Sequence, residues 1–165
     1  LTIAVNLEDF PQVLALAEHS ERLYASVGVH PEYAAAREAT EDELCRLAQH
    51  PKILGIGETG LDYYWHKDQP EWQRQRFRTH IRAARRVGKP LIVHTRDSAT
   101  DVIRTVMEQQ WSLRYTFTRV GEVAVYDVWY NGRGQIGRCA PLVTACSPGT
   151  LVGDVGVLLT QGMRA

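Results

Sequence analysis

Short apolar runs alternate with segments of helical periodicity between residue 1 and residue 110. The apolar runs have the composition of strands buried on both faces and cover residues 1–5, 24–29, 53–57 and 91–93. The helical segments cover residues 10–17, 41–49, 71–87 and 99–109. Strands that alternate with helices predict an α/β fold with a parallel sheet and right-handed crossovers. The alternation alone leaves two architectures open, a doubly wound sheet and part of a (β/α)₈ barrel.

Composition narrows the class of protein. The chain has 165 residues, the length of about one domain, and 19 basic side chains balance 19 acidic ones. Net charge therefore gives no general reason for binding nucleic acid or an anionic membrane. We find no apolar run near the ~20 residues of a membrane helix and no signal peptide in residues 1–10. The three cysteines form an odd, unclustered set, so we expect a cytoplasmic protein without membrane association.

The composition changes near residue 110. Sixteen of the 19 acidic residues and all six histidines precede that point, whereas eight of the 13 glycines follow it. We therefore divide the chain into a partial (β/α) domain, residues 1–110, and an atypical glycine-rich tail, residues 111–165. Two interpretations of the tail stay open: a small β segment, or sequence that is out of frame or divergent. The chain begins with Leu1, so we also expect that its natural N-terminus is missing.

Polar residues follow three of the expected strands, at the end where α/β proteins place their active sites. His30 follows the second strand, Glu58 and Asp62 follow the third, and His94 and Arg96 follow the fourth. A carboxylate with neutral imidazoles suits a divalent metal, and a bound metal supports hydrolysis. Each residue also has a structural interpretation, such as a polar strand end for His30 or an ion pair for Arg96.

Three motifs in this order resemble the TatD-type metal-dependent deoxyribonucleases. They are Val27-Gly-Val-His-Pro31, Gly55-Ile-Gly-Glu-Thr-Gly-Leu-Asp-Tyr-Tyr64 and Pro90-Leu-Ile-Val-His-Thr-Arg-Asp97. The resemblance implies a TIM-barrel-like fold of the metal-dependent (amido)hydrolase kind. It also implies one or two divalent cations (Mg²⁺, Mn²⁺ or Zn²⁺) and DNA as the substrate, cleaved at its phosphodiester bonds.

The resemblance also assigns roles to the strand-end residues. Glu58 matches the glutamate ligand, able to bridge two metals, and His94 matches a histidine ligand. His30 matches a further active-site histidine, expected to contact the substrate or phosphate. Asp62 and Arg96 match groups that orient the ligands or position the phosphate. We therefore predict metal ligation by Glu58 and His94 and catalytic roles for His30, Asp62 and Arg96.

The chain also departs from the family pattern. It lacks the initial His-x-His pair, no histidine follows His94, and the late Glu-Thr-Asp-Ser-Pro motif is absent. Residues 115–118 are a faint echo of the family's His-Cys-Phe strand end. A whole barrel needs ~250 residues, so we expect about strands two to five of eight. We predict impaired activity; an inactive fragment, or a hydrolase acting on another ester or amide, is the alternative.

Two further features have competing interpretations. An arginine stripe on the helix over residues 71–87 could contact DNA phosphates, but a solvated outer face is the favoured interpretation. Its members are Arg74, Arg78, Arg82, Arg85 and Arg86. The aromatic residues 63–65, which follow the third strand, could stack on bases or pack the loop.

Overall fold

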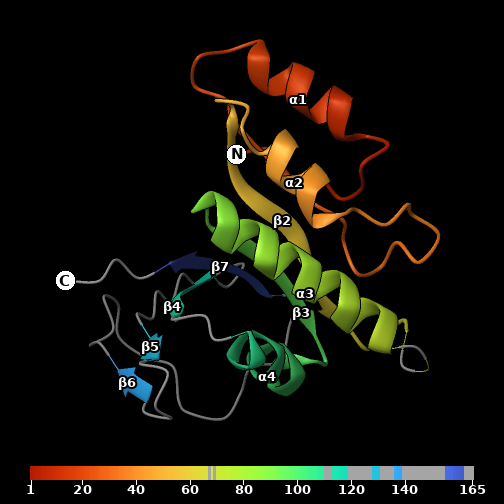
Figure 1. Cartoon of the computed structure of the whole chain (residues 1–165), viewed down its shortest axis with the longest axis vertical. Coiled ribbons are helices and arrows are strands. Elements are labelled where there is room, and N and C mark those ends of the chain that lie inside the picture. Colours follow the sequence, from red (N-terminus) through yellow and green to blue (C-terminus); the bar gives the residue numbers. More distant parts are fainter. Residues whose placement is uncertain are drawn as a thin grey trace.

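The structure is a computed structural model that describes residues 1–66, 68 and 70–109, together with the backbone of four later strands (Figure 1). The helices are α1 Phe10–Glu18, α2 Glu41–Leu47, α3 Pro70–Val87 and α4 Ala99–Glu108. The first three strands are β1 Ala25–Val27, β2 Ile53–Asp62 and β3 Leu91–Arg96. The later strands are β4 Leu113–Thr118, β5 Val128–Tyr130, β6 Ile136–Arg138 and β7 Val155–Gln161. Within the described part, no helix is long and apolar enough to cross a membrane.

The seven strands form one sheet in the order β1-β2-β3-β7-β4-β5-β6. Strands β1, β2 and β3 run parallel, as the βα alternation predicts. Strand β7 lies antiparallel between β3 and β4, so the sheet as a whole is mixed. The division at residue 110 and the nature of the tail stay predictions, because most of residues 111–165 lie outside the described part of the chain.

The first apolar run does not form a regular strand. Residues 1–5 make a single parallel bridge, between Thr2 and Ala25, and otherwise follow β1 and β2 through backbone hydrogen bonds. The Val5 carbonyl accepts from the His30 N–H, and the Ala4 carbonyl accepts from the Glu58 N–H. The segment therefore packs beside the strand ends that carry the candidate site, although its expected strand is not formed.

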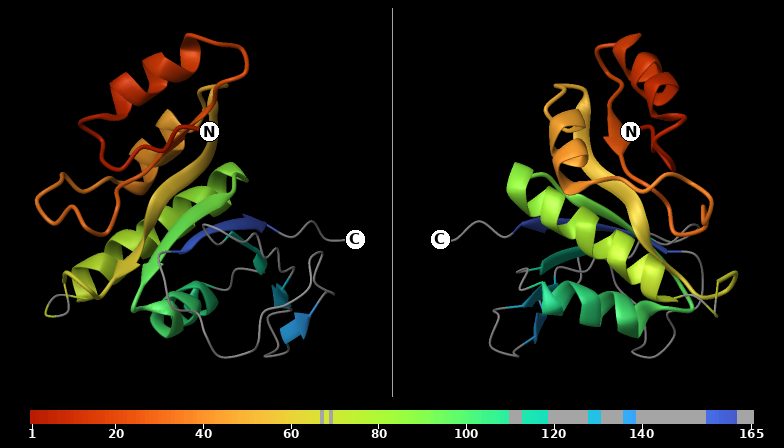
Figure 2. Two further views of the ribbon diagram at one scale, coloured as in Figure 1. Left: turned by 180° about the vertical axis from the view of Figure 1, so that it is seen from behind. Right: turned by 45° about the vertical axis from the view of Figure 1, so that its right-hand side comes forward.

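The helices begin and pack as their sequences predict. The Thr40 side chain caps α2 by accepting from the Glu43 N–H at 3.1 Å. Helix α3 covers β2, and both views of Figure 2 show it lying along the sheet. Its apolar face, with Phe77, Ile81 and Ala84, is fully buried and joins the core formed by the first three strands. This packing fixes the register of α3 against the strand ends.

Candidate metal centre

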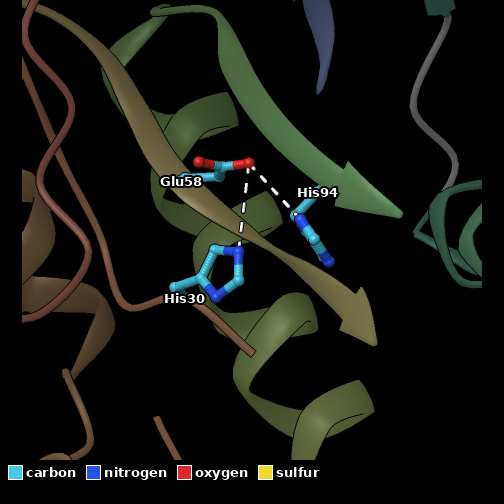
Figure 3. Close-up of side chains that lie close together, drawn as sticks. All are labelled: His30, Glu58 and His94. Carbon is cyan, nitrogen blue, oxygen red and sulfur yellow. Dashed lines mark ion pairs between the residues drawn. The ribbon is translucent and has the colours of Figure 1, made fainter. Parts of the chain in front are cut away.

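Three side chains meet toward the carboxyl ends of the parallel strands: His30 after β1, Glu58 within β2 and His94 within β3 (Figure 3). Glu58 and His94 were expected to follow their strands, but both strands continue past them, to Asp62 and Arg96. One oxygen of Glu58, Oε1, faces both imidazoles, at 3.6 Å from His94 Nδ1 and 4.0 Å from His30 Nε2. One ligand atom from each residue lies within 4.8 Å of the others. All three are buried or half-buried. Among the described residues, this is a cluster that could hold a metal ion.

Two glycines let β2 approach β3 closely on either side of Glu58. Gly57 and Gly60 both have φ of +137°, in the region that favours glycine. A Cβ on Gly57 would overlap the carbonyl oxygen of Ile92, and a Cβ on Gly60 would overlap that of His94. The glycines of the motif therefore bring the Glu58 carboxylate beside the β3 imidazole.

Asp62 determines which nitrogen of His94 faces the cluster. Its Oδ2 lies 3.0 Å from His94 Nε2, and because an ionised carboxylate only accepts, this nitrogen carries the proton. The lone pair of His94 Nδ1 is then directed at Glu58 Oε1, which is also an acceptor. A histidine that donates to a carboxylate and presents its other nitrogen is typical of metal-ligating imidazoles. The space between Nδ1 and Oε1 thus favours a cation.

His30 has the opposite arrangement of donor and acceptor. Its Nδ1 accepts from the Glu32 N–H at 3.1 Å, so the proton of the neutral ring lies on Nε2. That N–H faces Glu58 and the cluster. In this arrangement His30 offers a hydrogen-bond donor, while His94 offers a lone pair.

The charges of the cluster follow from this geometry. Burial, followed by the nearby His94, lowers the pKa of His30 to about 4, so its ring is neutral at pH 7. Burial also opposes the charged form of His94, but Glu58 and Asp62 outweigh it and raise the His94 pKa. The interaction with the His94 side chain lowers the pKa of Glu58 and outweighs burial, so this carboxylate is ionised. The raised pKa of His94 shows that Glu58 and Asp62 stabilise a positive charge at this ring.

Three buried polar side chains of α3 support the site from behind; we call Gln73, Arg76 and His80 the α3 polar row. Gln73 accepts from the Asp62 N–H and donates to the carbonyls of Asp62 and Pro31. Arg76 donates to the His30 carbonyl at 2.8 Å. The row had no signal in the sequence beyond its i, i+3, i+7 spacing on the apolar face of the helix.

His80 completes this support. Its Nε2 accepts from the Val29 N–H at 3.0 Å, and its Nδ1 donates to the Arg76 carbonyl at 2.8 Å. The ring is fully buried, and burial lowers its pKa to about 4. It is therefore a neutral structural histidine that fixes the backbone directly before His30.

The remaining predicted residues lie beside the cluster. Asp62 is buried on the His94 side, as described above. Arg96 places its guanidinium 3.9 Å from the centre of the Tyr64 ring. Four arginines of the stripe pair with acids of α2 or α4, for example Arg82 with Glu41, and Arg85 donates to the Gln109 carbonyl. The structure therefore groups His30, Glu58, Asp62 and His94, with Arg96 at their edge.

Parallel strands β1, β2 and β3, with a carboxylate and two imidazoles toward their carboxyl ends, fit a metal-dependent hydrolase of the α/β class. The family described as TatD related DNase matches residues 1–119. The chain belongs to this family, and its fold is a partial TIM-barrel-like one. A second family, the TATA-binding-like protein domain of the TOTE conflict systems, matches residues 98–155, less than half of the chain.

Individual proteins that resemble this chain are also named as TatD proteins or TatD homologs. A Mycobacterium tuberculosis protein named uncharacterized metal-dependent hydrolase TatD is 41% identical over 109 residues, covering 62% of this chain and 41% of that protein. The 3'-5' ssDNA/RNA exonuclease TatD of Escherichia fergusonii is 33% identical, covering 59% of this chain and 38% of that protein. The crystal structure of YJJV, a TATD homolog from Escherichia coli, superposes with a TM-score of 0.60 at 28% identity, covering 65% of this chain and 42% of that one. The chain therefore spans less than half the length of these relatives.

Proposed function

We propose that this chain carries part of a divalent-metal site that hydrolyses phosphodiester bonds in nucleic acid. The observation that carries the proposal is the pair of acceptors, Glu58 Oε1 and His94 Nδ1, that face each other at 3.6 Å. Two acceptors in this arrangement need a proton or a metal ion between them. Membership of a family whose relatives are named metal-dependent hydrolases supports the metal.

We assign Glu58 and His94 as the residues that would hold the ion, with Asp62 fixing the orientation of the His94 ring. A bound divalent ion polarises a phosphoryl oxygen and lowers the pKa of a bound water toward neutrality. His30 Nε2–H, which faces the same point, would donate to a phosphate oxygen. Its low pKa keeps the ring neutral, so it adds a directed donor without repelling the ion. Arg96 would add positive charge at the edge of the site.

Nucleic acid is the substrate class that the relatives favour. One of them is named an ssDNA/RNA exonuclease, and the family is described as a DNase family. The net charge of the chain is zero, so recognition of a phosphate would depend on the metal centre and the groups beside it. The odd number of cysteines supports a cytoplasmic setting.

We expect weak metal binding. Of the three clustered residues, Glu58 and His94 direct lone pairs at the ion position, whereas His30 directs an N–H there. No histidine follows His94 in the sequence. Two protein ligands leave most positions of the ion to water, so affinity and turnover should both be low.

The test is a calorimetric titration of the chain with Mn²⁺, with the Mn²⁺ EPR signal as an independent readout of binding. Glu58→Gln and His94→Ala should each lower the affinity at least about tenfold. The matched control is His50→Ala, because His50 pairs with Glu18 away from the cluster. Equal affinity in all variants would contradict the assignment of the ligands.

Activity assays on the same chain distinguish the alternative functions. Cleavage of an oligonucleotide that is lost in Glu58→Gln would support the phosphodiesterase. Cleavage of small esters or amides without cleavage of DNA would support another substrate class. Metal binding without any turnover would support an inactive fragment.

A further inference from the structure

Two aromatic side chains lie exposed directly beside the candidate metal centre. Tyr63, Tyr64 and Trp65 follow β2, but they differ in their surroundings. Tyr63 packs against the core and donates its hydroxyl to Asp101 at 2.6 Å. Tyr64 and Trp65 instead expose 49% and 57% of their surface. We call Tyr64 and Trp65 the aromatic pair; the core does not account for their exposed rings.

The aromatic pair is tied to the metal centre through one carboxylate. Asp62 Oδ1 accepts from the backbone N–H of Tyr64 at 3.0 Å and of Trp65 at 3.3 Å. The other oxygen of the same carboxylate, Oδ2, accepts from His94. Because Asp62 is buried, the pair has a fixed position relative to the imidazole that we assign as a metal ligand.

The two rings also hold each other in place. They meet edge to face, with centres 4.6 Å apart and planes at 89°. The Arg96 guanidinium lies 3.9 Å from the centre of Tyr64 and 5.6 Å from that of Trp65. Cation–π and edge-to-face contacts of this kind keep aromatic rings ordered at low entropic cost. The result is a preformed aromatic surface with positive charge beside it.

We propose that the aromatic pair stacks on an unpaired base of a single-stranded nucleic acid whose phosphate lies at the metal centre. The inference rests on the proposed function, because the nearby phosphodiesterase site makes a nucleotide the relevant ligand. Exposed aromatic rings beside cationic groups are the common means of binding single strands without sequence preference. A base within a duplex has both faces covered, so this surface selects an end or segment that is already unstacked.

The contacts assign the larger share of stacking to Trp65. Arg96 is close to the Tyr64 ring, whereas Trp65 is the more exposed of the two and has the larger π surface. Tyr64 would then act mainly by holding the Trp65 ring in its orientation.

The experiment measures binding of an oligothymidylate of about eight nucleotides to the full chain in EDTA, by fluorescence anisotropy. Without metal there is no hydrolysis, so the result does not depend on whether the metal centre works. Trp65→Ala should weaken binding roughly tenfold, and Trp65→Phe should restore most of the affinity. Truncation leaves the backbone N–H groups that bond Asp62 in place, so the fold should persist.

Two controls make the result specific. Tyr24→Ala removes a tyrosine that is 37% exposed but lies before β1, at the opposite end of the strand from the site. It should leave binding unchanged. A strand of the same length built from abasic nucleotides keeps the phosphates but has no bases. On that strand Trp65→Ala and the unaltered chain should bind alike.

The inference is overturned if Trp65→Ala binds the oligothymidylate as tightly as the unaltered chain. It is also overturned if the loss is equal on the abasic strand, because Trp65 would then act on the backbone. Failure of the Mn²⁺ titration would reject the metal centre while leaving this binding result standing, so the two failures can be told apart.

Discussion

The candidate metal cluster and the α3 polar row both contain buried polar side chains, but the two regions differ in how many of these polar atoms have hydrogen-bond partners. In the row, Gln73 makes three hydrogen bonds to site backbone and both nitrogens of His80 are paired. In the cluster, the Glu58 oxygen lies 3.6 and 4.0 Å from its neighbouring imidazoles, beyond ordinary hydrogen-bond distance.

The difference separates a structural network from a ligand site. Buried polar groups that already have all their partners rigidify a fold and have no capacity left for a ligand. Groups that face one another with unused lone pairs retain that capacity. The row also donates to and accepts from the backbone of His30 and Asp62. The fully hydrogen-bonded α3 polar row therefore holds the residues of the candidate metal cluster in position.

The largest effect that tests this comparison should come from Arg76. Its guanidinium is buried and donates to the carbonyls of His30 and Tyr33 and to Glu38. Arg76→Leu removes the guanidinium from both carbonyls, which keep one backbone donor each, and breaks the ion pair with Glu38. We therefore expect the free energy of unfolding in urea to fall by about 4 kcal/mol. Arg76→Lys, which keeps the charge without the planar fork, should give an intermediate loss.

The matched control is Arg46→Leu, at an exposed ion pair with Glu43 of 4.0 Å. It should leave the unfolding midpoint unchanged. Equal losses at Arg76 and Arg46 would show that the α3 polar row does not support the fold.

The next effect is a dependence of stability on pH. The pKa of His80 is lowered to about 4 in the folded protein, against 6.5 for an ordinary histidine. The unfolded chain therefore binds this proton more tightly, so the stabilisation is present above pH 6.5 and is lost as pH falls toward 4. That difference corresponds to about 3 kcal/mol. Unfolding in urea at a series of pH values measures it.

His30 should contribute in the same direction, because burial lowers its pKa to about 4 as well. The slope of stability against pH between 4 and 6.5 should therefore fall by about half in His80→Gln. It should fall further when His30→Gln is added. An unchanged slope in His80→Gln would mean that the ring is not buried in its neutral form.

Most of the first three βα units could be predicted from sequence, because buried strands and capped helices leave local signals. The Thr40 cap and the apolar face of α3 are examples. Residues 1–5 were predicted wrongly as a strand, because a continuous apolar run fits any buried extended segment. Strand β2 extends past its apolar run to Asp62, since glycines and polar residues of the motif continue the pairing with β3.

The site could be predicted only in part. The strand-end rule brought Glu58 and His94 into one group, and the family resemblance assigned their roles, which stay a proposal. The proton positions on His30 and His94 depend on Glu32 and Asp62, and no spacing in the sequence encodes such contacts. Gln73 and His80 were also missed, because a polar residue on an apolar helix face has many uses.

The smallest effect should come from the arginine stripe, which tests whether partnered charges bind substrate. Arg82 pairs with Glu41, and Arg86 pairs with Glu41 and Asp42. Arginines that already neutralise acids on α2 are not free to neutralise phosphates, so they displace few counterions from the DNA. The double variant Arg82→Ala/Arg86→Ala should therefore change oligothymidylate affinity less than about twofold. It should also leave the slope of log affinity against log salt unaltered, whereas a slope reduced by about one per arginine would place these side chains on phosphates.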